Sequence, residues 1–254
     1  MLFDSVSCLQ QVVFQSKDFS PRCFSIDGIC FRSFTSPHAA GTFADIFVFQ
    51  QALYLKTGFR FGRNIVMIRF ARPDDSAAIL EIYGAYIETP ITFECMLPTM
   101  LEFSKRMADI SAFYPCLVCE EESKVIGFAY AHRHMERQAY QWNAELSVYL
   151  DPSFTSKGLG KKLYAILIEM LKLQGVRTVY GGVTVPNEKS ESLHKAMGFS
   201  VAGTYHHAGF KDGKWRDVTW FEKTIAPYDS YPEPVVSIGS IPKQELLEII
   251  FSFQ

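Results

Sequence analysis

The chain has 254 residues, of which 48% are hydrophobic and 20% are charged, and its formal net charge is −2. This length permits one sizeable hydrophobic core in one or two domains. The nearly balanced charge gives no basic surface of the kind that attracts a phosphate backbone, so we expect no nucleic-acid partner.

The six cysteines predict neither a disulfide framework nor a metal site. Their spacing follows no secreted-domain pattern and no cationic leader opens the chain, so we expect a cytoplasmic location. Cys116 and Cys119 form a CxxC pair in a predicted strand, where positions three apart face opposite sides. The apolar stretch at 39–55 is too short for a membrane span, which takes roughly 18 to 20 residues, and Asp45 interrupts it, so we expect no membrane partner.

The first 64 residues differ from the rest of the chain. They hold 11 of the 22 phenylalanines, three of the six cysteines and no glutamate, and no long segment keeps helical or strand periodicity. We interpret residues 1–64 as an irregular N-terminal extension. Either it is an arm that binds a partner, or it precedes a true first residue at Met67.

Regular patterning follows over residues 65–225, the predicted functional domain. The pattern predicts helices at 73–87, 98–110, 158–174 and 187–197, and strands at 116–120, 125–132, 142–150, 176–183, 199–207 and 215–222. Hairpins at each end of this order favour an α/β domain with a mixed, mostly antiparallel sheet flanked by helices. Residues 226–254 read as a proline-rich arm with a short helix at 243–251.

The strongest local signal is the strand-to-helix junction at 151–161. Gly158 and Gly160 allow a ligand to approach the backbone closely, and the N–H groups of the first helical turn favour negative charge. The junction lacks the Lys-Ser/Thr of a P-loop and the third glycine of the dinucleotide fingerprint. It predicts a pyrophosphate cradle, and the alternative is a helix start without a ligand.

This junction resembles the acetyl-CoA loop of GNAT acetyltransferases, Gln/Arg-x-x-Gly-x-Gly/Ala, with Thr155 in place of the Gln or Arg. Three further blocks are similar to phosphinothricin acetyltransferases of that superfamily. They are Arg-x-Ala-Tyr-x-Trp-x-x-Glu at 137–145, Pro-Asn-x-x-Ser followed by His-x-x-x-Gly-Phe at 186–199, and Ala-Gly-Phe-Lys-x-Gly-x-Trp-x-Asp at 208–217. The resemblance covers roughly residues 67 to 225.

The resemblance implies the GNAT fold, acetyl-CoA as co-substrate without a metal, a small-molecule amine as acceptor, and a homodimer. Acetyl-CoA is expected between the strand of Glu145 and the strand at 176–183, which splay apart. The residues implied to contact it are Val148, Leu150, Ser156, Lys157, Gly158, Leu159, Gly160, Lys161 and Asn187.

The resemblance also implies the catalytic groups. Glu145 would be the general base, because an ammonium with a pKa of about 10 must lose a proton before its nitrogen attacks a thioester. The alternative is a structural Glu paired with a cation. His194 stands where most GNAT enzymes have Tyr, and either protonates the departing thiolate or is structural.

The acceptor pocket is expected near Arg133, Tyr140 and Trp142. Arg133 would pair with a substrate carboxylate, or else belong to an exposed basic loop. The expected reaction transfers acetyl from acetyl-CoA to the amino group of a small amino acid or analogue of the phosphinothricin or methionine sulfoximine type. The alternatives are acetylation of a protein N-terminus or lysine, and a non-catalytic acyl-CoA sensor.

Overall fold

The computed structural model describes residues 21–26, 29–34 and 66–253. The chain divides into two units, Met1–Phe61 and Gly62–Gln254, which are described separately. In the first unit, β1 (Pro21–Ile26) pairs antiparallel with β2 (Ile29–Phe34). We predicted an irregular segment at 1–64, and this hairpin was not predicted. The Asp-Gly dipeptide at 27–28 is a hairpin signal in the sequence. The other residues of that extension lie outside the described residues.

The second unit contains a seven-stranded sheet in the order β3-β4-β5-β6-β7-β9-β8. Its strands are β3 (Val66–Phe70), β4 (Cys116–Glu121), β5 (Lys124–Arg133), β6 (Asn143–Leu150), β7 (Thr178–Val185), β8 (Ser200–Lys211) and β9 (Lys214–Thr224). The pair β6–β7 is parallel, whereas the other five neighbouring pairs are antiparallel. The predicted mixed, mostly antiparallel sheet is confirmed.

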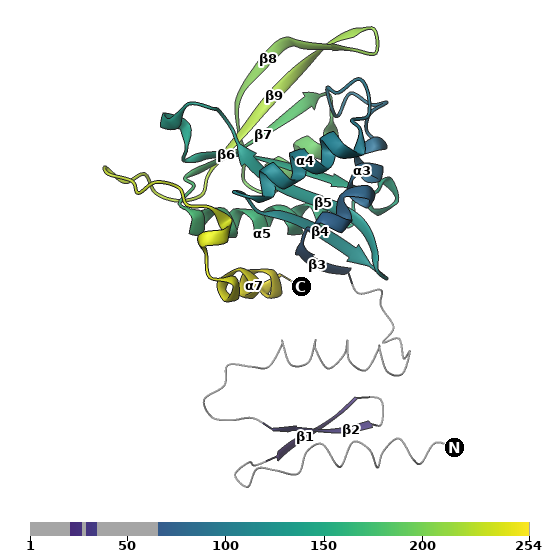
Figure 1. The fold of residues 1–254 in the computed structure, drawn as a ribbon, viewed down its shortest axis with the longest axis vertical. Helices are drawn as coiled ribbons and strands as arrows, with labels where there is room; N and C mark the ends of the chain where they lie inside the picture. Colours follow the sequence, from purple (N-terminus) through teal and green to yellow (C-terminus); the bar gives the residue numbers. More distant parts are fainter. Residues whose placement is uncertain (1–20, 27–28, 35–65, 254) are drawn as a thin grey trace. The chain divides into compact units, whose positions relative to one another are not determined.

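Helices cover both faces of this sheet (Figure 1). On one face α3 (Ser76–Gly84) and α4 (Met100–Ser111) pack against Cys116, Val118 and Phe128. On the other face α5 (Leu159–Gln174) packs against Leu117, Cys119 and Ala129, and α7 (Lys243–Ser252) packs beside it. Cys116 and Cys119 thus point to opposite faces, as the strand period requires.

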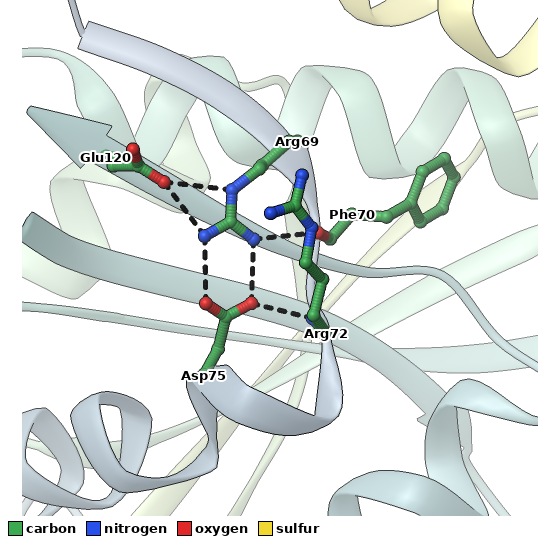
Figure 2. Close-up of polar contacts among 5 residues, drawn as sticks. All are labelled: Arg69, Phe70, Arg72, Asp75 and Glu120. Carbon is green, nitrogen blue, oxygen red and sulfur yellow. Dashed lines mark hydrogen bonds and ion pairs between the residues drawn. The ribbon is translucent and has the colours of Figure 1, made fainter. Parts of the chain in front are cut away.

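An ion-pair network anchors the edge strand β3 (Figure 2). The Arg69 guanidinium donates to both oxygens of Asp75, at 2.7 and 2.8 Å, and its Nε donates to Glu120 on β4 at 2.9 Å. These charge-assisted bonds hold the pKa of Asp75 below its usual value. Asp75 ends the 3₁₀ turn η1 (Pro73–Asp75), so the network fixes the start of α3 relative to the sheet.

The predicted helix at 73–87 is divided in the structure. It consists of η1 and α3, and the chain leaves α3 after Gly84 through turns closed by the bonds Tyr86 N to Tyr83 O and Ile87 N to Gly84 O. The loop that follows reaches α4, whose start is capped by Thr99. This loop forms part of the site.

The central feature of the sheet is the divergence of β6 and β7. They pair at three positions, from Asn143↔Thr178 to Glu145↔Tyr180. Beyond Glu145, β6 continues to pair with β5 as far as Leu150, while β7 stays paired with β9 along its whole length. A gap in the sheet therefore opens at Glu145.

Candidate active site

A cavity of about 390 Å³ occupies the gap between β6 and β7. Glu145 and Tyr149 line it from the face that carries α3 and α4, whereas Tyr164 of α5 and His194 of α6 (Glu188–Ala196) line it from the opposite face. Since successive residues of a strand point to opposite faces, lining from both faces means that the cavity passes through the sheet. Two ligands that enter from opposite faces can meet inside it.

The exposed edge of β6 presents backbone groups to this cavity. The Trp142 carbonyl accepts from Arg177 N at 2.8 Å, and the Leu146 carbonyl accepts from the Tyr164 hydroxyl at 3.1 Å, so both carbonyls point toward the β7 side. Peptide groups alternate in direction along a strand, and Val148 is two residues beyond Leu146. The Val148 N–H group therefore also points into the gap.

The junction before α5 has the geometry of an anion cradle. Ser156 and Gly158 have positive φ values of 62° and 81°, and no side chain caps the first turn of α5. A Cβ built at Gly158 would meet no atom within 4 Å, so its backbone faces open space. A Cβ built at Gly160 would lie 3.6 Å from Leu193 and 3.8 Å from Val148, so this cradle adjoins the edge of β6. These residues fit the pyrophosphate of acetyl-CoA.

Glu145 lies at the fork between β6 and β7, and two imidazoles flank its carboxylate. Nε2 of His132 is 4.0 Å from Oε1, and Nδ1 of His134 is 3.5 Å from Oε2. The His134 ring stacks on Tyr180 at a centroid distance of 4.3 Å. The carboxylate is thereby held at the mouth of the cavity with one nitrogen near each oxygen.

A roof closes the cavity on the Glu145 side. Ile91, Thr92 and Phe93, from the loop between α3 and α4, line the cavity together with the β8–β9 hairpin. Lys211 is buried and donates to the carbonyls of Thr92 and Glu94 at 2.7 and 2.9 Å. The Phe93 ring lies against Gly209, where a Cβ would approach it to 2.7 Å. Hairpin and loop are therefore tied together as one roof.

His194 is enclosed by aromatic rings and is only 2% exposed. Its ring stacks on Phe221 and meets Phe199 edge-on, and a Cβ built at Gly181 would lie 2.2 Å from its Nε2. Nδ1 lies 2.8 Å from the Ser190 carbonyl, which can only accept, so Nδ1 carries the hydrogen. Burial lowers the pKa of this imidazole.

A family model described as an acetyltransferase (GNAT) domain matches residues 68–220, which is more than half of the chain. This match covers the cavity, the cradle and the roof. The chain belongs to the GNAT family of acetyltransferases. Both the family and the fold predicted from the sequence are confirmed, and the chain is an N-acetyltransferase.

Curated relatives and solved structures are similar to this GNAT enzyme over most of their length. Phosphinothricin N-acetyltransferase of Streptomyces viridochromogenes is 35% identical over 180 residues, which cover 70% of this chain and 98% of the relative. An L-methionine sulfoximine/L-methionine sulfone acetyltransferase of Salmonella typhimurium is 33% identical over 160 residues, covering 61% of this chain and 92% of the relative. The crystal structure of a phosphinothricin acetyltransferase from Sinorhizobium meliloti in complex with acetyl-CoA matches with a TM-score of 0.63 and 29% identity, covering 68% of this chain and 98% of that one.

The structure of the GNAT enzyme brings most of the predicted site residues together. Glu145, Val148, Asn187 and His194 line the cavity, and the cradle at 156–161 adjoins it through Gly160. The Asn187 side-chain oxygen accepts from Ser190 N at 3.2 Å as the cap of α6, which leaves its amide nitrogen for a ligand.

Three predicted acceptor residues lie outside the cavity lining. Arg133 alternates with His132 and so points to the sheet face opposite Glu145, and its Nη1 donates to the Glu136 carbonyl at 2.9 Å. The Trp142 indole donates to the Glu233 carbonyl of the C-terminal arm, and Tyr140 is exposed. His132 and His134 stand beside Arg133 at the expected start of the acceptor pocket, and Lys211 stands in a recognised block, but the sequence assigned no role to any of the three.

Metal ligands and reactive thiols are two other kinds of group that could support chemistry in the part of the chain that the structure describes. There, no group of three His, Cys, Asp or Glu side chains is placed to hold a metal ion. Burial raises the pKa of the Cys116 and Cys119 thiols to about 12, so neither is a ready nucleophile. Within the same residues, no helix has the length and apolarity that a membrane crossing requires.

Replacement of Gly158 by alanine tests the cradle. Gly158→Ala should weaken acetyl-CoA binding about tenfold in calorimetry, because an alanine resists the φ of 81° that shapes the anion-binding turn. Gly213→Ala is the matched control, since Gly213 has a φ of 73° and equally open surroundings in the β8–β9 turn. Equal affinities in the two variants would contradict the assignment.

The buried His194 should make stability depend on pH. Its pKa is lowered in the folded state, so the unfolded chain binds a proton more readily. Stability is therefore complete above the unfolded pKa of about 6.5 and declines as the pH falls below it. His194→Gln should flatten the fall in Tm between about pH 7 and pH 5, whereas His207→Asn, at an exposed position, should leave the fall unchanged. The same slope in both variants would refute this.

Proposed function

We propose that this GNAT enzyme transfers the acetyl group of acetyl-CoA to the α-amino group of a small amino acid or amino-acid analogue. The observation that carries the proposal is the position of Glu145, whose carboxylate stands at the fork of β6 and β7 and lines a cavity that passes through the sheet. Relatives named for phosphinothricin and for methionine sulfoximine or sulfone support an acceptor of this class.

The roof supports a small acceptor in preference to a peptide. Thr92 and Phe93 line the cavity on the Glu145 side, and Lys211 ties their loop to the β8–β9 hairpin through two hydrogen bonds. A protein N-terminus or a lysine on a folded protein would need an open groove at this position. A non-catalytic acyl-CoA sensor would have no need for a carboxylate at the fork.

Different groups of the chain bind the coenzyme, accept the proton and stabilise the developing charge. The amides at 156–161 bind the pyrophosphate of acetyl-CoA, and the amide nitrogen of Asn187 adds a donor at the start of α6. Glu145 takes a proton from the ammonium of the acceptor, which frees the lone pair for attack on the thioester. The Val148 N–H group stabilises the negative charge that develops on the thioester oxygen. Amine and thioester are held together, so attack is effectively intramolecular.

For His194 we propose a packing role. Its hydrogen-bearing Nδ1 is bound to the Ser190 carbonyl, and burial opposes the protonated form that an acid would need. The ring instead fills the space beside Gly181 and holds α6 against β7. The proton for the departing thiolate then comes from another source, such as water in the cavity.

We also propose that the enzyme is a cytoplasmic homodimer. Exposed apolar side chains on β8 and β9, including Val201, Phe210 and Trp215, offer a surface for a second copy. Association of this kind would cover the outer side of the hairpin that roofs the cavity.

Mass spectrometry of products tests the proposed reaction. With acetyl-CoA and a panel of phosphinothricin, methionine sulfoximine, methionine sulfone and free peptides, at least one amino-acid analogue should gain an acetyl group, and the peptides should not.

Glu145→Gln should lower kcat by about 10²- to 10³-fold with nearly unchanged acetyl-CoA affinity, because only the base is lost.

The control for that measurement is Glu169→Gln, which removes a carboxylate from the exposed side of α5 and should leave the rate unchanged. The deficit of Glu145→Gln should shrink at high pH, where more of the amine is already neutral. A wild-type rate that does not vary with pH across the titration range of the amine would refute general-base catalysis.

A further inference from the structure

Two imidazoles that belong to none of the sequence motifs stand beside the proposed base. His132 pairs directly opposite Glu145 in the β5–β6 register, and His134 follows β5 by one residue. Their nearest nitrogens are 4.0 and 3.5 Å from the two carboxylate oxygens. The register thus gives each oxygen of Glu145 its own imidazole.

The two imidazoles differ in their access to solvent. The His134 side chain is 11% exposed, and its ring is confined by stacking on Tyr180 and by edge contact with Trp220. The His132 side chain is 34% exposed, against 21% for Glu145 itself. His132 is therefore the neighbour of Glu145 that faces water.

The tautomer of His132 directs a lone pair at Glu145. Its Nδ1 lies 2.9 Å from the Arg133 carbonyl, and because a carbonyl only accepts, Nδ1 carries the hydrogen. In the neutral ring Nε2 is then unprotonated and faces Oε1 of Glu145. The 4.0 Å between these atoms is a distance that a small ring rotation or one bridging water closes.

The proton balance of the reaction gives such a group a role. When an ammonium is deprotonated and the resulting amine attacks a thioester, the C–N bond forms, the C–S bond breaks, and the nitrogen loses two protons in all. One of them ends on the thiol of coenzyme A, and the other is left over. Glu145 takes up this proton and must release it before the next turnover, while the acceptor occupies the cavity in front of the carboxylate.

We infer that His132 relays this proton from Glu145 to solvent. The inference rests on the proposed function, in which Glu145 is the base. His132 acts through Glu145 and does not touch the acceptor. Nε2 of His132 takes the proton from the carboxylic acid, and the imidazolium then loses it from the same nitrogen to water.

Chemical rescue tests the relay in the full-length enzyme. With an acceptor that the wild type acetylates, His132→Ala should lower kcat about tenfold, less than loss of the base itself, and leave both KM values nearly unchanged. Added imidazole should restore most of the rate, because a small base in solution replaces the missing ring. His132→Gln keeps size and hydrogen bonding but cannot carry a proton, and should show the same loss.

His207→Asn is the matched control, since it removes an exposed imidazole that does not line the cavity, suits the positive φ of 53° at this position and keeps the backbone bond to Asp217. It should change neither the rate nor the response to imidazole. Full kcat in both His132 variants, or a loss that imidazole does not restore in a variant with normal Tm, would overturn the relay. If instead the wild type acetylates no small amine, or Glu145→Gln is fully active, the proposed function itself fails.

Discussion

The site depends on one constraint, the loss of pairing between β6 and β7 beyond Glu145. β6 is held by β5 and β7 by β9, so neither strand can close the gap alone. Two glycines of β7 reinforce the separation. Because Gly181 has no side chain, the His194 ring packs against one face of the strand, and Gly182 leaves the same room for the Trp220 ring on the other face. The result is a sheet edge inside the molecule, with amide groups and a carboxylate lining the cavity in which we propose that the two substrates meet.

The β8–β9 hairpin covers part of this gap, and we attribute the proposed preference for small acceptors to it. Asp217 accepts from His206 Nδ1 and from His207 N, which fixes the bulge where the hairpin bends over the cavity. Lys211 then ties the hairpin to the loop after α3. A hydrogen bond of 2.7 Å between the Tyr83 and Thr92 hydroxyls ties the same loop to α3. A buried lysine without a carboxylate is unusual, but two carbonyl acceptors satisfy it and hold the roof in place.

Sequence reasoning predicted the fold, which is confirmed, and it singled out the cradle and Glu145, whose roles stay predictions, because each has a local signal. The cradle has glycines at a helix start, the strands have alternating apolar residues, and Glu145 stands in a motif of fixed spacing. Each of these signals lies within a short segment of the chain. The partners of Glu145 have no such signal, since His132 reaches it only through the β5–β6 register. The same register explains why Arg133, one residue further, lies on the opposite face. Lys211 stood in a recognised motif, but its role appears only once the loop at 92–94 is folded against it.

Amide hydrogen exchange at single residues, measured with and without acetyl-CoA, tests the central claim most directly. If acetyl-CoA enters the gap, it should slow exchange at Val148 and in the cradle at 158–161, because these N–H groups face the coenzyme. Ser147 and Tyr149, which alternate with Val148 and point toward β5, should change little. Protection of Ser147 and Val148 alike would contradict this account. So would binding of acetyl-CoA without any change at Val148.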